Sequence, residues 1–444
     1  MMRNPVIAGF FPDPSVCATS DYFYLAASSF AFYPGIPLFR SKNLVDWEHI
    51  GHALTQDHLD FIALEISDGV WAPTLRYHEG VFYLVFSVSH GRYGMKTYLM
   101  TTNDPTDGWT EPKQLHIEGF DPSLFFDDDR VWLTICRDAE PSNPQSPGAL
   151  WLAELDLDSQ EVVGPETLIW GGALKGAWVE VPRIYKKDNT YWLIAAEGGT
   201  ERKHAVTAAC SKSITGSYRG DDRNPLLTHR HLGDSAEIAN VGHADLVEDT
   251  TGNWWAVALG VRPIEGHHVL GREVFLLPVE WDSQGLVFAP GDGRVLTDIR
   301  QYSALGKNTS GARSRMRTLQ NSEPTVIHGS GPHGSEPHGA ELSGAKSRGA
   351  ETLSADGLAW VSARTPKEVQ ADGETLSLEL NSSNSEWLAN ALMTRQRTHP
   401  FEFSASARRT RGWSSNAHCF RVPELKQVRA TFTFHKFGRR DHFM

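Results

Sequence analysis

The chain has 444 residues, more than a single hydrophobic core usually supports, so two domains are expected. Its 42 Lys and Arg residues against 54 Asp and Glu residues give a formal net charge of −12, which argues against a nucleic-acid or membrane-surface partner. The 14 Trp, 39 Gly and 24 Pro residues favour an all-β fold with many short strands and turns.

The N-terminal sequence MMRNPVIAGFFPDPS has no apolar segment of the kind found in secretory signals. No uninterrupted apolar run approaches the roughly 18 residues of a membrane-spanning helix. The four cysteines are widely spaced and form no CxxC pair, which argues against a zinc site or a disulfide framework. We therefore expect a cytoplasmic protein with reduced thiols and no membrane partner.

Five segments share one pattern, which predicts the fold. Each has an apolar strand start, a polar turn and an aromatic residue ten positions after its opening residue, as in a β-hairpin. The segments are PSVCATSDYFYL from Pro14, PTLRYHEGVFYL from Pro73, PSLFFDDDRVWL from Pro122, PRIYKKDNTYWL from Pro182 and ADLVEDTTGNWW from Ala244. Their aromatic residues are Tyr24, Tyr83, Trp132, Trp192 and Trp254.

The spacing of these segments indicates how they assemble. Their openings are 59, 49, 60 and 62 residues apart, which leaves room for about four short strands in each unit. Such units cannot bury both sheet faces alone and must stack on one another. The sequence therefore predicts a five-bladed β-propeller over residues 1–303. A linear β-solenoid has shorter coils and fits the spacing less well.

The composition changes after the last repeat. Residues 304–352 are rich in Ser, Gly, His and Glu and are expected to form a linker or disordered insert. Strand-like segments return in residues 353–444, as LAWVSA, ETLSLEL and FEFSASA, and indicate a second, partial β domain. Its last part is basic, with eleven Lys or Arg against three Asp or Glu from residue 395 onward, but it contains no recognisable nucleic-acid-binding motif.

Three carboxylates occupy equivalent places in the repeats. The innermost strand of each blade starts near the propeller axis, so the residues just before the openings converge: Asp13, Ala72, Asp121, Val181 and His243. Glu180 lies one residue further back in the fourth repeat. An Asp-Pro pair can simply initiate a turn, but three carboxylates near one axis favour chemistry. Glycoside hydrolysis uses such a set, with one carboxyl as acid and another as base.

The motifs at these residues resemble the β-xylosidases of glycoside hydrolase family 43. The resemblance runs in order from about residue 4 to 300 and is close to the subgroup whose propeller is followed by a β-sandwich. It is carried by NPVIAGFFPDPSV, SSFAFYPGIPLFRSKNLVDWEHIGHAL, VWAPTLRYHEGVFYLVFS, GFDPSLFFDDD, VEVPRIYKKD, EGGT, GHADLV and LGREVFLLPVEW. It implies Asp13 as general base, Glu180 as general acid and Asp121 as the residue that raises the pKa of the acid and orients it.

The resemblance also implies a substrate pocket. Phe30 and Trp71 would form its walls, Arg272 would bind sugar hydroxyls, and Thr200 would line its mouth. His243 would lie at the axis. In some relatives the equivalent histidine helps to hold a calcium ion, so a structural calcium is left open, although no metal site is assigned and no cofactor is expected to be required.

Two features depart from the family pattern. The acid motif, usually Glu-Gly-Pro, is Glu180-Val181-Pro182 here, which adds bulk beside the acid. The sandwich resemblance stops at about Arg408, so the second domain is expected to be truncated, with a frameshifted or truncated gene as the favoured explanation. Relatives with an intact sandwich are often oligomers, which leaves a homo-oligomer open.

The sequence therefore predicts an inverting, exo-acting β-1,4-xylosidase that releases xylose from the non-reducing end of xylo-oligosaccharides. The first alternative is an α-L-arabinofuranosidase of the same fold, because xylose and arabinofuranose present similar hydroxyl groups. A second alternative is a catalytically inactive glycan-binding propeller. A third is a non-functional product of a damaged gene.

Overall fold

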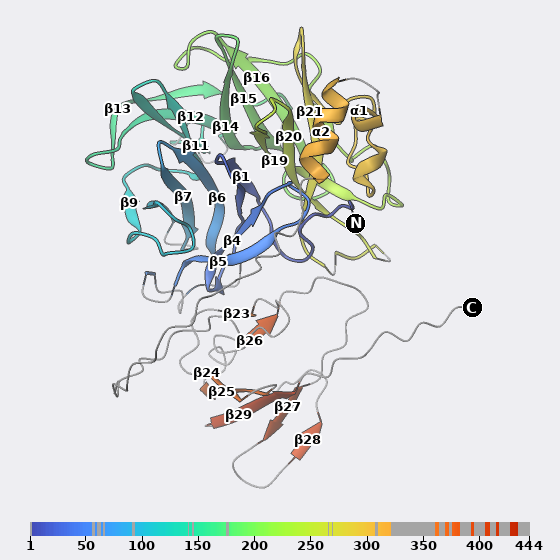
Figure 1. The fold of residues 1–444 in the computed structure, drawn as a ribbon. Helices are drawn as coiled ribbons and strands as arrows, with labels where there is room; N and C mark the ends of the chain where they lie inside the picture. The colour runs from blue at the N-terminus through green and yellow to red at the C-terminus, as the bar shows by residue number, and fades with distance from the viewer. Residues whose placement is uncertain are drawn as a thin grey trace, which may run out of the picture.

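The computed structural model describes residues 2–320, apart from residues 56–57, 60–63, 65–66, 91–93, 141, 144–145, 175–176, 265, 269 and 307–309. Beyond residue 320 it describes the strand segments 360–363, 369–372, 375–381, 392–394, 405–408, 414–416 and 427–433. Five antiparallel sheets, each built around four strands, are arranged in a ring (Figure 1). This arrangement confirms the predicted five-bladed β-propeller.

The blades follow the chain without crossovers. Blade 1 consists of β1 (Ser15–Ala18), β2 (Phe23–Ala26), β4 (Gly35–Ser41) and β5 (Glu48–Leu54). Blade 2 consists of β6 (Gly69–His78), β7 (Val81–Ser89), β8 (Met95–Thr102) and β9 (Lys113–Leu115). Blade 3 consists of β10 (Phe120–Asp127), β11 (Arg130–Asp138), β12 (Gly148–Asp156) and β13 (Glu161–Trp170). Blade 4 consists of β14 (Val179–Lys187), β15 (Thr190–Glu197), β16 (Ala205–Ser211) and β17 (Arg219–Gly220), with β18 (Leu227–Thr228) also paired to β16. Blade 5 consists of β19 (Ala239–Glu248), β20 (Trp254–Val261), β21 (Glu273–Asp282) and β22 (Gly285–Phe288).

Each sequence repeat forms the two innermost strands of one blade. In the first four blades the predicted aromatic residue pairs with the residue three positions after the opening, as Tyr24 does with Cys17. The fifth hairpin differs, because Val247 pairs with Trp255 rather than with Trp254. Its turn is one residue longer, and Trp255 is the fully buried one of the two tryptophans. The prediction of Trp254 as the equivalent aromatic residue was therefore wrong by one position.

All five inner strands start with the same backbone irregularity. The residue before each opening has a positive φ, between 39° and 59°: Asp13, Ala72, Asp121, Val181 and His243. In blades 2 to 5 the hairpin register shifts at this place, as in a β-bulge. A bulge bends its strand and redirects the neighbouring side chains. The repeat therefore specifies a bent strand end at five equivalent positions.

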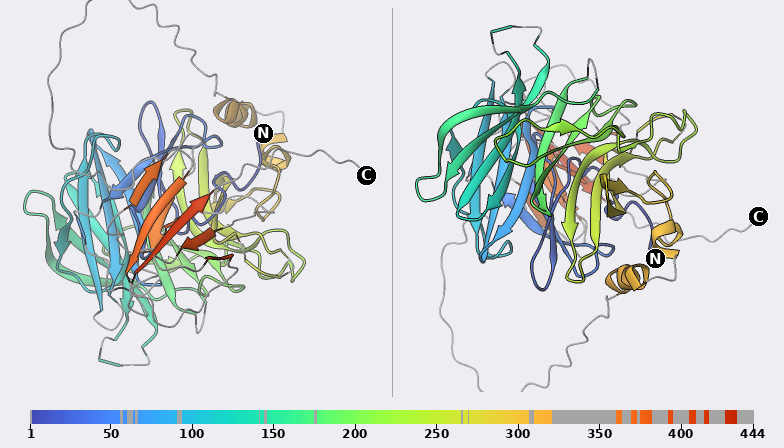
Figure 2. Two further views of the ribbon diagram at one scale, coloured as in Figure 1. Left: turned by 90° about the horizontal axis from the view of Figure 1, so that it is seen from below. Right: turned by 90° about the horizontal axis from the view of Figure 1, so that it is seen from above.

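The N-terminal segment closes the ring against blade 5. Ile7 forms an isolated antiparallel bridge with Val274 of β21. The side-chain amide of Asn4 donates to the carbonyl groups of Leu276 and Leu296, both at 2.8 Å, and its oxygen accepts from Leu276 N at 2.8 Å. Figure 2 shows the N-terminus beside the helices that follow blade 5. Blade 1 and blade 5 are thus joined by residues about 270 positions apart.

Helices occupy the start of the segment expected to be a linker. After the 3-10 turn η2 (Ile299–Gln301) come α1 (Ser303–Gly306) and α2 (Ser310–Gln320). Ala312 and Leu319 of α2 are buried. The first residues after the boundary predicted at residue 303 therefore carry enough apolar side chains to pack on blade 5. The rest of the predicted linker lies outside the described residues.

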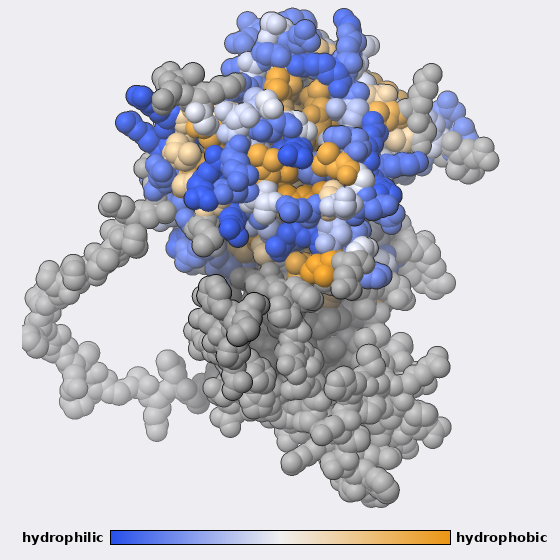
Figure 3. Space-filling model, turned by 90° about the vertical axis from the view of Figure 1, so that its right-hand side faces the viewer, coloured by the Kyte–Doolittle hydropathy of each residue, from blue (hydrophilic) through white to orange (hydrophobic). Residues whose placement is uncertain are grey.

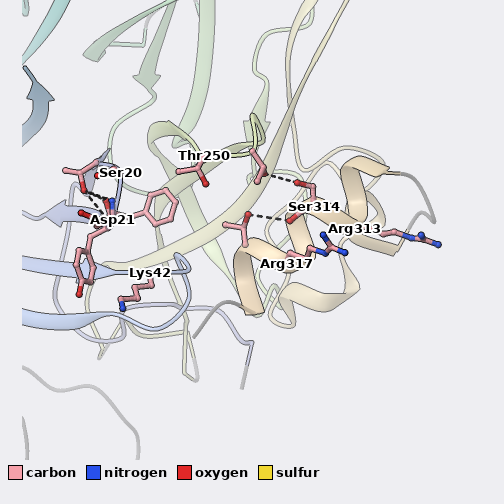
Figure 4. Close-up of a pocket in the computed structure, with 12 residues that line it drawn as sticks. Ser20, Asp21, Lys42, Thr250, Arg313, Ser314 and Arg317 are labelled. Carbon is pink, nitrogen blue, oxygen red and sulfur yellow. Dashed lines mark hydrogen bonds between the residues drawn. The ribbon is translucent and has the colours of Figure 1, made fainter. Parts of the chain in front are cut away.

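A polar network attaches α2 to the hairpin turn of blade 5. The carboxylate of Asp249 accepts hydrogen bonds from Thr251, Asn253, Trp255 and Thr318. Ser314 of α2 donates to Thr251 on the same turn. A polar cavity of about 550 Å³ lies between α2, this turn and the turn of blade 1, as Figure 4 shows.

Strands also occur in the C-terminal segment 353–444. The strands β24 (Val369–Asp372), β25 (Thr375–Asn381), β29 (Gln427–Thr433), β27 (Ala405–Arg408) and β28 (Ser414–Asn416) form one sheet in this order. A second sheet joins β26 (Leu392–Thr394) and β23 (Trp360–Ala363) to β3 (Phe32–Tyr33). The remainder of the predicted sandwich lies outside the described residues.

The described surface is mainly polar. The large apolar residues that stand out as exposed are Tyr77, Val163 and Leu168. Figure 3 shows mostly hydrophilic residues on one side of the propeller, with apolar residues in small separate patches. Within the described part of the chain, no helix has the length and apolar character needed to cross a membrane.

Candidate active site

The inner strands bring the three predicted carboxylates to one end of the propeller axis. Asp13 and Asp121 are the positive-φ residues at the inner-strand starts of blades 1 and 3, and Glu180 directly precedes the corresponding residue of blade 4. Asp13 and Asp121 are buried, and Glu180 is half-buried. The three groups are close enough for the charges of Asp13 and Glu180 to act on Asp121. The convergence expected from the repeat is therefore present.

Asp13 is surrounded by donors and positive charge. Ser28 Oγ donates to Asp13 Oδ2 at 2.7 Å, and Arg272 Nη1 donates to Asp13 Oδ1 at 3.3 Å. His243 Nδ1 lies 3.4 Å from the same Oδ1. Burial alone would raise the pKa of Asp13, but Arg272, His243 and Ser28 outweigh it, and the pKa lies below its usual value. Asp13 is therefore an anion at neutral pH.

Glu180 is in the opposite state. Burial, followed by repulsion from Asp13, raises its pKa from 4.5 to about 7, although Arg272 opposes the shift. Burial and the charges of Glu180 and Asp13 raise the pKa of Asp121 as well. Because repulsion between two anions is mutual, Asp121 and Glu180 do not readily ionise together. The site thus combines an ionised carboxylate with a carboxyl group that keeps its proton near neutral pH.

Half-buried aromatic side chains form a continuous arc beside the carboxylates. Ring centroids are 6.1 Å apart for Phe30 and Trp71, 6.4 Å for Trp71 and Phe120, and 6.5 Å for Phe120 and Trp178. Phe10 extends the arc, at 5.8 Å from Phe30. Phe120 directly precedes Asp121 and Trp178 comes two residues before Glu180, so these rings are attached to the strand ends that carry the carboxylates. Such flat apolar walls suit the faces of a sugar ring.

The other predicted site residues fall into two groups. Arg272 contacts Asp13 and also lies over the ring of Phe30, at 5.1 Å from its centroid, and His243 is buried next to Asp13. Thr200 is exposed in the turn after β15, and among the described residues no contact joins it to the carboxylates. The structure therefore brings Phe30, Trp71, His243 and Arg272 to the site, but not Thr200.

Comparison with known proteins assigns the family. The sequence model of the protein family glycosyl hydrolases family 43 matches residues 2–287, which form most of the propeller. The chain belongs to this family. A xylosidase/arabinosidase of Butyrivibrio fibrisolvens is 43% identical over 304 residues, which cover 67% of this chain and 58% of the relative. A non-reducing-end α-L-arabinofuranosidase of Bacteroides ovatus is 37% identical over 66% of this chain and 54% of its own length.

A solved structure extends the similarity. The xylan β-1,4-xylosidase of Bacillus halodurans C-125 has a TM-score of 0.71 and 30% identity, and the match covers 92% of this chain and 73% of that one. The family 43 chain spans a little more than half the length of the two curated relatives. Their names include both xylosidase and arabinofuranosidase activities.

Several residues of the family 43 site were missed by the sequence analysis. Phe10, Phe120 and Trp178 extend the aromatic arc, and Ser28 links Asp13 to blade 2 by accepting from the backbone N–H of Ala72 at 2.7 Å. Their closeness along the chain to Asp121 and Glu180 could have indicated Phe120 and Trp178. Ser28 carries no such signal, because its role depends on a neighbouring blade.

A buried polar network fills the axis below the carboxylates. Asp245 accepts from Ser15, Arg76 and Tyr185, which come from blades 1, 2 and 4. Arg183 also lies near, with Nη1 3.5 Å from Asp245 Oδ2. The position directly after each repeat opening could have indicated part of this network, because it is polar in all five repeats: Ser15, Thr74, Ser123, Arg183 and Asp245.

The surroundings of His243 do not fit the calcium ion that some relatives hold. Calcium prefers six to eight oxygen ligands, and the described residues contain no group of three His, Cys, Asp or Glu side chains arranged to hold a metal. The guanidinium group of Arg183 lies 3.4 Å from His243 Nε2, where a cation would be repelled.

Proposed function

We propose that the chain is an inverting, exo-acting β-1,4-xylosidase that releases xylose from the non-reducing end of xylo-oligosaccharides. The observation that carries this proposal is the opposite protonation of two carboxyl groups at one site. Asp13 is held as an anion and Glu180 keeps a proton up to about pH 7. This is the pair that an inverting glycosidase needs.

In the proposed reaction each group has one role. Glu180 donates its proton to the glycosidic oxygen as the bond between this oxygen and the anomeric carbon breaks. Asp13 accepts a proton from a water molecule, whose oxygen attacks the opposite face of the same carbon. Arg272 helps to keep Asp13 ionised, and burial together with the charge of Asp13 keeps the proton on Glu180. The arc from Phe30 to Trp178 would hold the sugar ring and exclude water.

The first test compares the wild-type protein with two variants. Wild-type protein is expected to hydrolyse p-nitrophenyl β-D-xyloside, and Asp13→Ala is expected to lose at least about a thousandfold in kcat because the base is removed. The exposed Asp107→Ala serves as a matched control and should keep wild-type activity. If folded wild-type protein binds xylobiose but cleaves no glycoside, a glycan-binding propeller replaces this proposal.

The stereochemical course is a separate test. Inversion predicts that xylose released from a β-xyloside appears first as the α-anomer, which proton NMR detects before mutarotation. Initial release of the β-anomer would refute the inverting mechanism.

The second candidate function is an α-L-arabinofuranosidase. It is favoured by the Bacteroides ovatus relative, which carries that name, and by the dual name of the Butyrivibrio fibrisolvens relative. A higher kcat/KM for p-nitrophenyl α-L-arabinofuranoside than for the β-xyloside would select this function.

A further inference from the structure

A fully buried arginine lies directly below the candidate site. Arg183 follows Pro182 in β14 and is 1% exposed. Its Nη1 donates to the carbonyl oxygens of Pro14 at 3.1 Å and Ala244 at 2.9 Å. Its Nη2 lies 3.4 Å from His243 Nε2. Burying a cation is costly unless it is paired and hydrogen-bonded, and these contacts join blades 1, 4 and 5 around it.

The guanidinium group of Arg183 determines which ring nitrogen of His243 carries a hydrogen. A guanidinium group only donates hydrogen bonds, so Nε2 of His243 must accept. Burial lowers the pKa of His243 to about 3, so the ring is neutral and carries a single N–H. That hydrogen is then on Nδ1, which lies 3.4 Å from Asp13 Oδ1. The charged and titratable groups that act on the ring are Asp13, Arg183, His204 and Arg272.

We propose that Arg183 is a positioning residue that fixes the tautomer of His243, so that His243 presents an N–H group to the carboxylate of Asp13. This inference rests on the proposed function for the role of Asp13 as base, but the tautomer itself does not depend on activity. The N–H dipole stabilises the anion and helps to hold its orientation. His243 is itself only 4% exposed, so the ring has little freedom to turn.

The same contact explains why the axis does not fit a metal ion. With hydrogen on Nδ1 and an arginine donor on Nε2, neither nitrogen of His243 has a lone pair free for a metal. The positive charge of Arg183 also lies next to His243 Nε2, where a bound metal ion would be repelled. The proposal therefore also predicts that a chelator leaves both folding and activity unchanged.

The first experiment observes the tautomer directly. In protein labelled with ¹⁵N-histidine, long-range ¹H–¹⁵N spectra distinguish a ring protonated on Nδ1 from one protonated on Nε2. The signal of His243 is assigned by its absence in His243→Gln. We expect the Nδ1–H form in wild-type protein between pH 5 and pH 8, and a shift toward the Nε2–H form in Arg183→Met. An Nε2–H form in wild-type protein would overturn the proposal.

The second experiment leaves Arg183 in place, in case Arg183→Met does not fold. Asparagine places an amide at the level of Nδ1, and glutamine places one at the level of Nε2. His243→Asn can therefore present an N–H to Asp13, whereas His243→Gln cannot. We expect His243→Asn to stay within about threefold of wild type in kcat, and His243→Gln to lose about tenfold with little change in KM.

The pH profile separates positioning from a purely structural role. Loss of the N–H near Asp13 should raise the pKa of Asp13, so the acid limb of kcat/KM moves to higher pH in His243→Gln and in Arg183→Met, but not in His243→Asn. Equal losses in His243→Asn and His243→Gln, with unchanged acid limbs, would contradict the proposal. If the wild-type enzyme proves inactive, the NMR experiment still tests the tautomer, so the two proposals fail independently.

Discussion

Five residues at the starts of the inner strands adopt a backbone conformation that non-glycine residues rarely take. Each costs of order 1 kcal/mol or more, and Val181 is the least favourable because it is β-branched. The sequence analysis noted Val181 as a departure from Glu-Gly-Pro, and its φ of 59° explains why glycine is usual there. Because Asp13 and Asp121 stand at two of these positions, the strain and the proposed chemistry occur together.

The protonation of Glu180 predicts a leaving-group effect. Glu180→Gln removes the proton donor, so hydrolysis of xylobiose should fall at least about a thousandfold in kcat, whereas an aryl xyloside with an acidic phenol should lose about tenfold or less. In wild-type enzyme, kcat/KM on xylobiose should fall above about pH 7, the pKa of Glu180. Steady-state kinetics on both substrates measure this effect. The exposed Glu118→Gln is the control, and equal losses on both substrates would rule out Glu180 as the acid.

The same pKa shift predicts a pH-dependent effect on stability. The folded state holds the Glu180 proton up to about pH 7, whereas the unfolded chain releases it near pH 4.5, so ionisation destabilises the fold between these values. Replacing Glu180 by Gln removes this cost, and the free energy of unfolding should rise by about 3 kcal/mol more at pH 8 than at pH 4. Urea denaturation at the two pH values measures the difference. The same gain at both pH values would show that ionisation is not its cause.

At the scale of single elements, the hairpin repeat was predictable because its signals are local. Strand, turn and aromatic residue follow each other within twelve residues, and the structure confirms all five hairpins. The fifth was misread by one position because its turn, from Asp249 to Asn253, is longer, and either of two adjacent tryptophans fits the sequence pattern. The helix α2 was missed because its polar composition resembles the segment after it, and its stability depends on contacts with blade 5.

The attachment of α2 predicts a local effect. Thr318→Val keeps the shape of the side chain but removes the hydroxyl that donates to Asp249 Oδ2 at 2.8 Å. The loss should destabilise the packed helix by about 1–2 kcal/mol, because it leaves the buried carboxylate with one donor fewer. Hydrogen exchange in residues 310–320 should become about tenfold faster, while the inner strands of blades 1 to 4 stay protected. Thr250→Val, at an exposed threonine on the facing turn, should change neither.

At the scale of the whole molecule, the sequence predicted the number of blades and the convergence of three carboxylates. Both follow from the repeat alone. It could not predict which side chains meet across the axis, because partners such as Arg183 and Asp245 lie in different blades, and their pairing depends on the closed ring. The same holds for Ser28, whose hydroxyl links Asp13 to the backbone of Ala72. The carboxylates of the site were thus predictable, and the resemblance also indicated Arg272 and His243, which act on the pKa of Asp13, whereas Ser28 could not be predicted.

The contacts that close the ring predict a large contribution of Asn4 to stability. Among the described residues, no strand from the end of the propeller completes blade 1, so the contacts of the N-terminal segment with β21 join the ends of the ring. Asn4→Ala removes three hydrogen bonds of 2.8 Å and leaves the backbone groups of Leu276 and Leu296 without these partners. The free energy of unfolding should fall by about 3 kcal/mol, measured by urea denaturation with tryptophan fluorescence. Asn103→Ala, at an exposed asparagine, is the matched control and should stay within about 0.5 kcal/mol of wild type. If Asn4→Ala were as stable as this control, the ring would be closed by apolar packing between blades 1 and 5 instead.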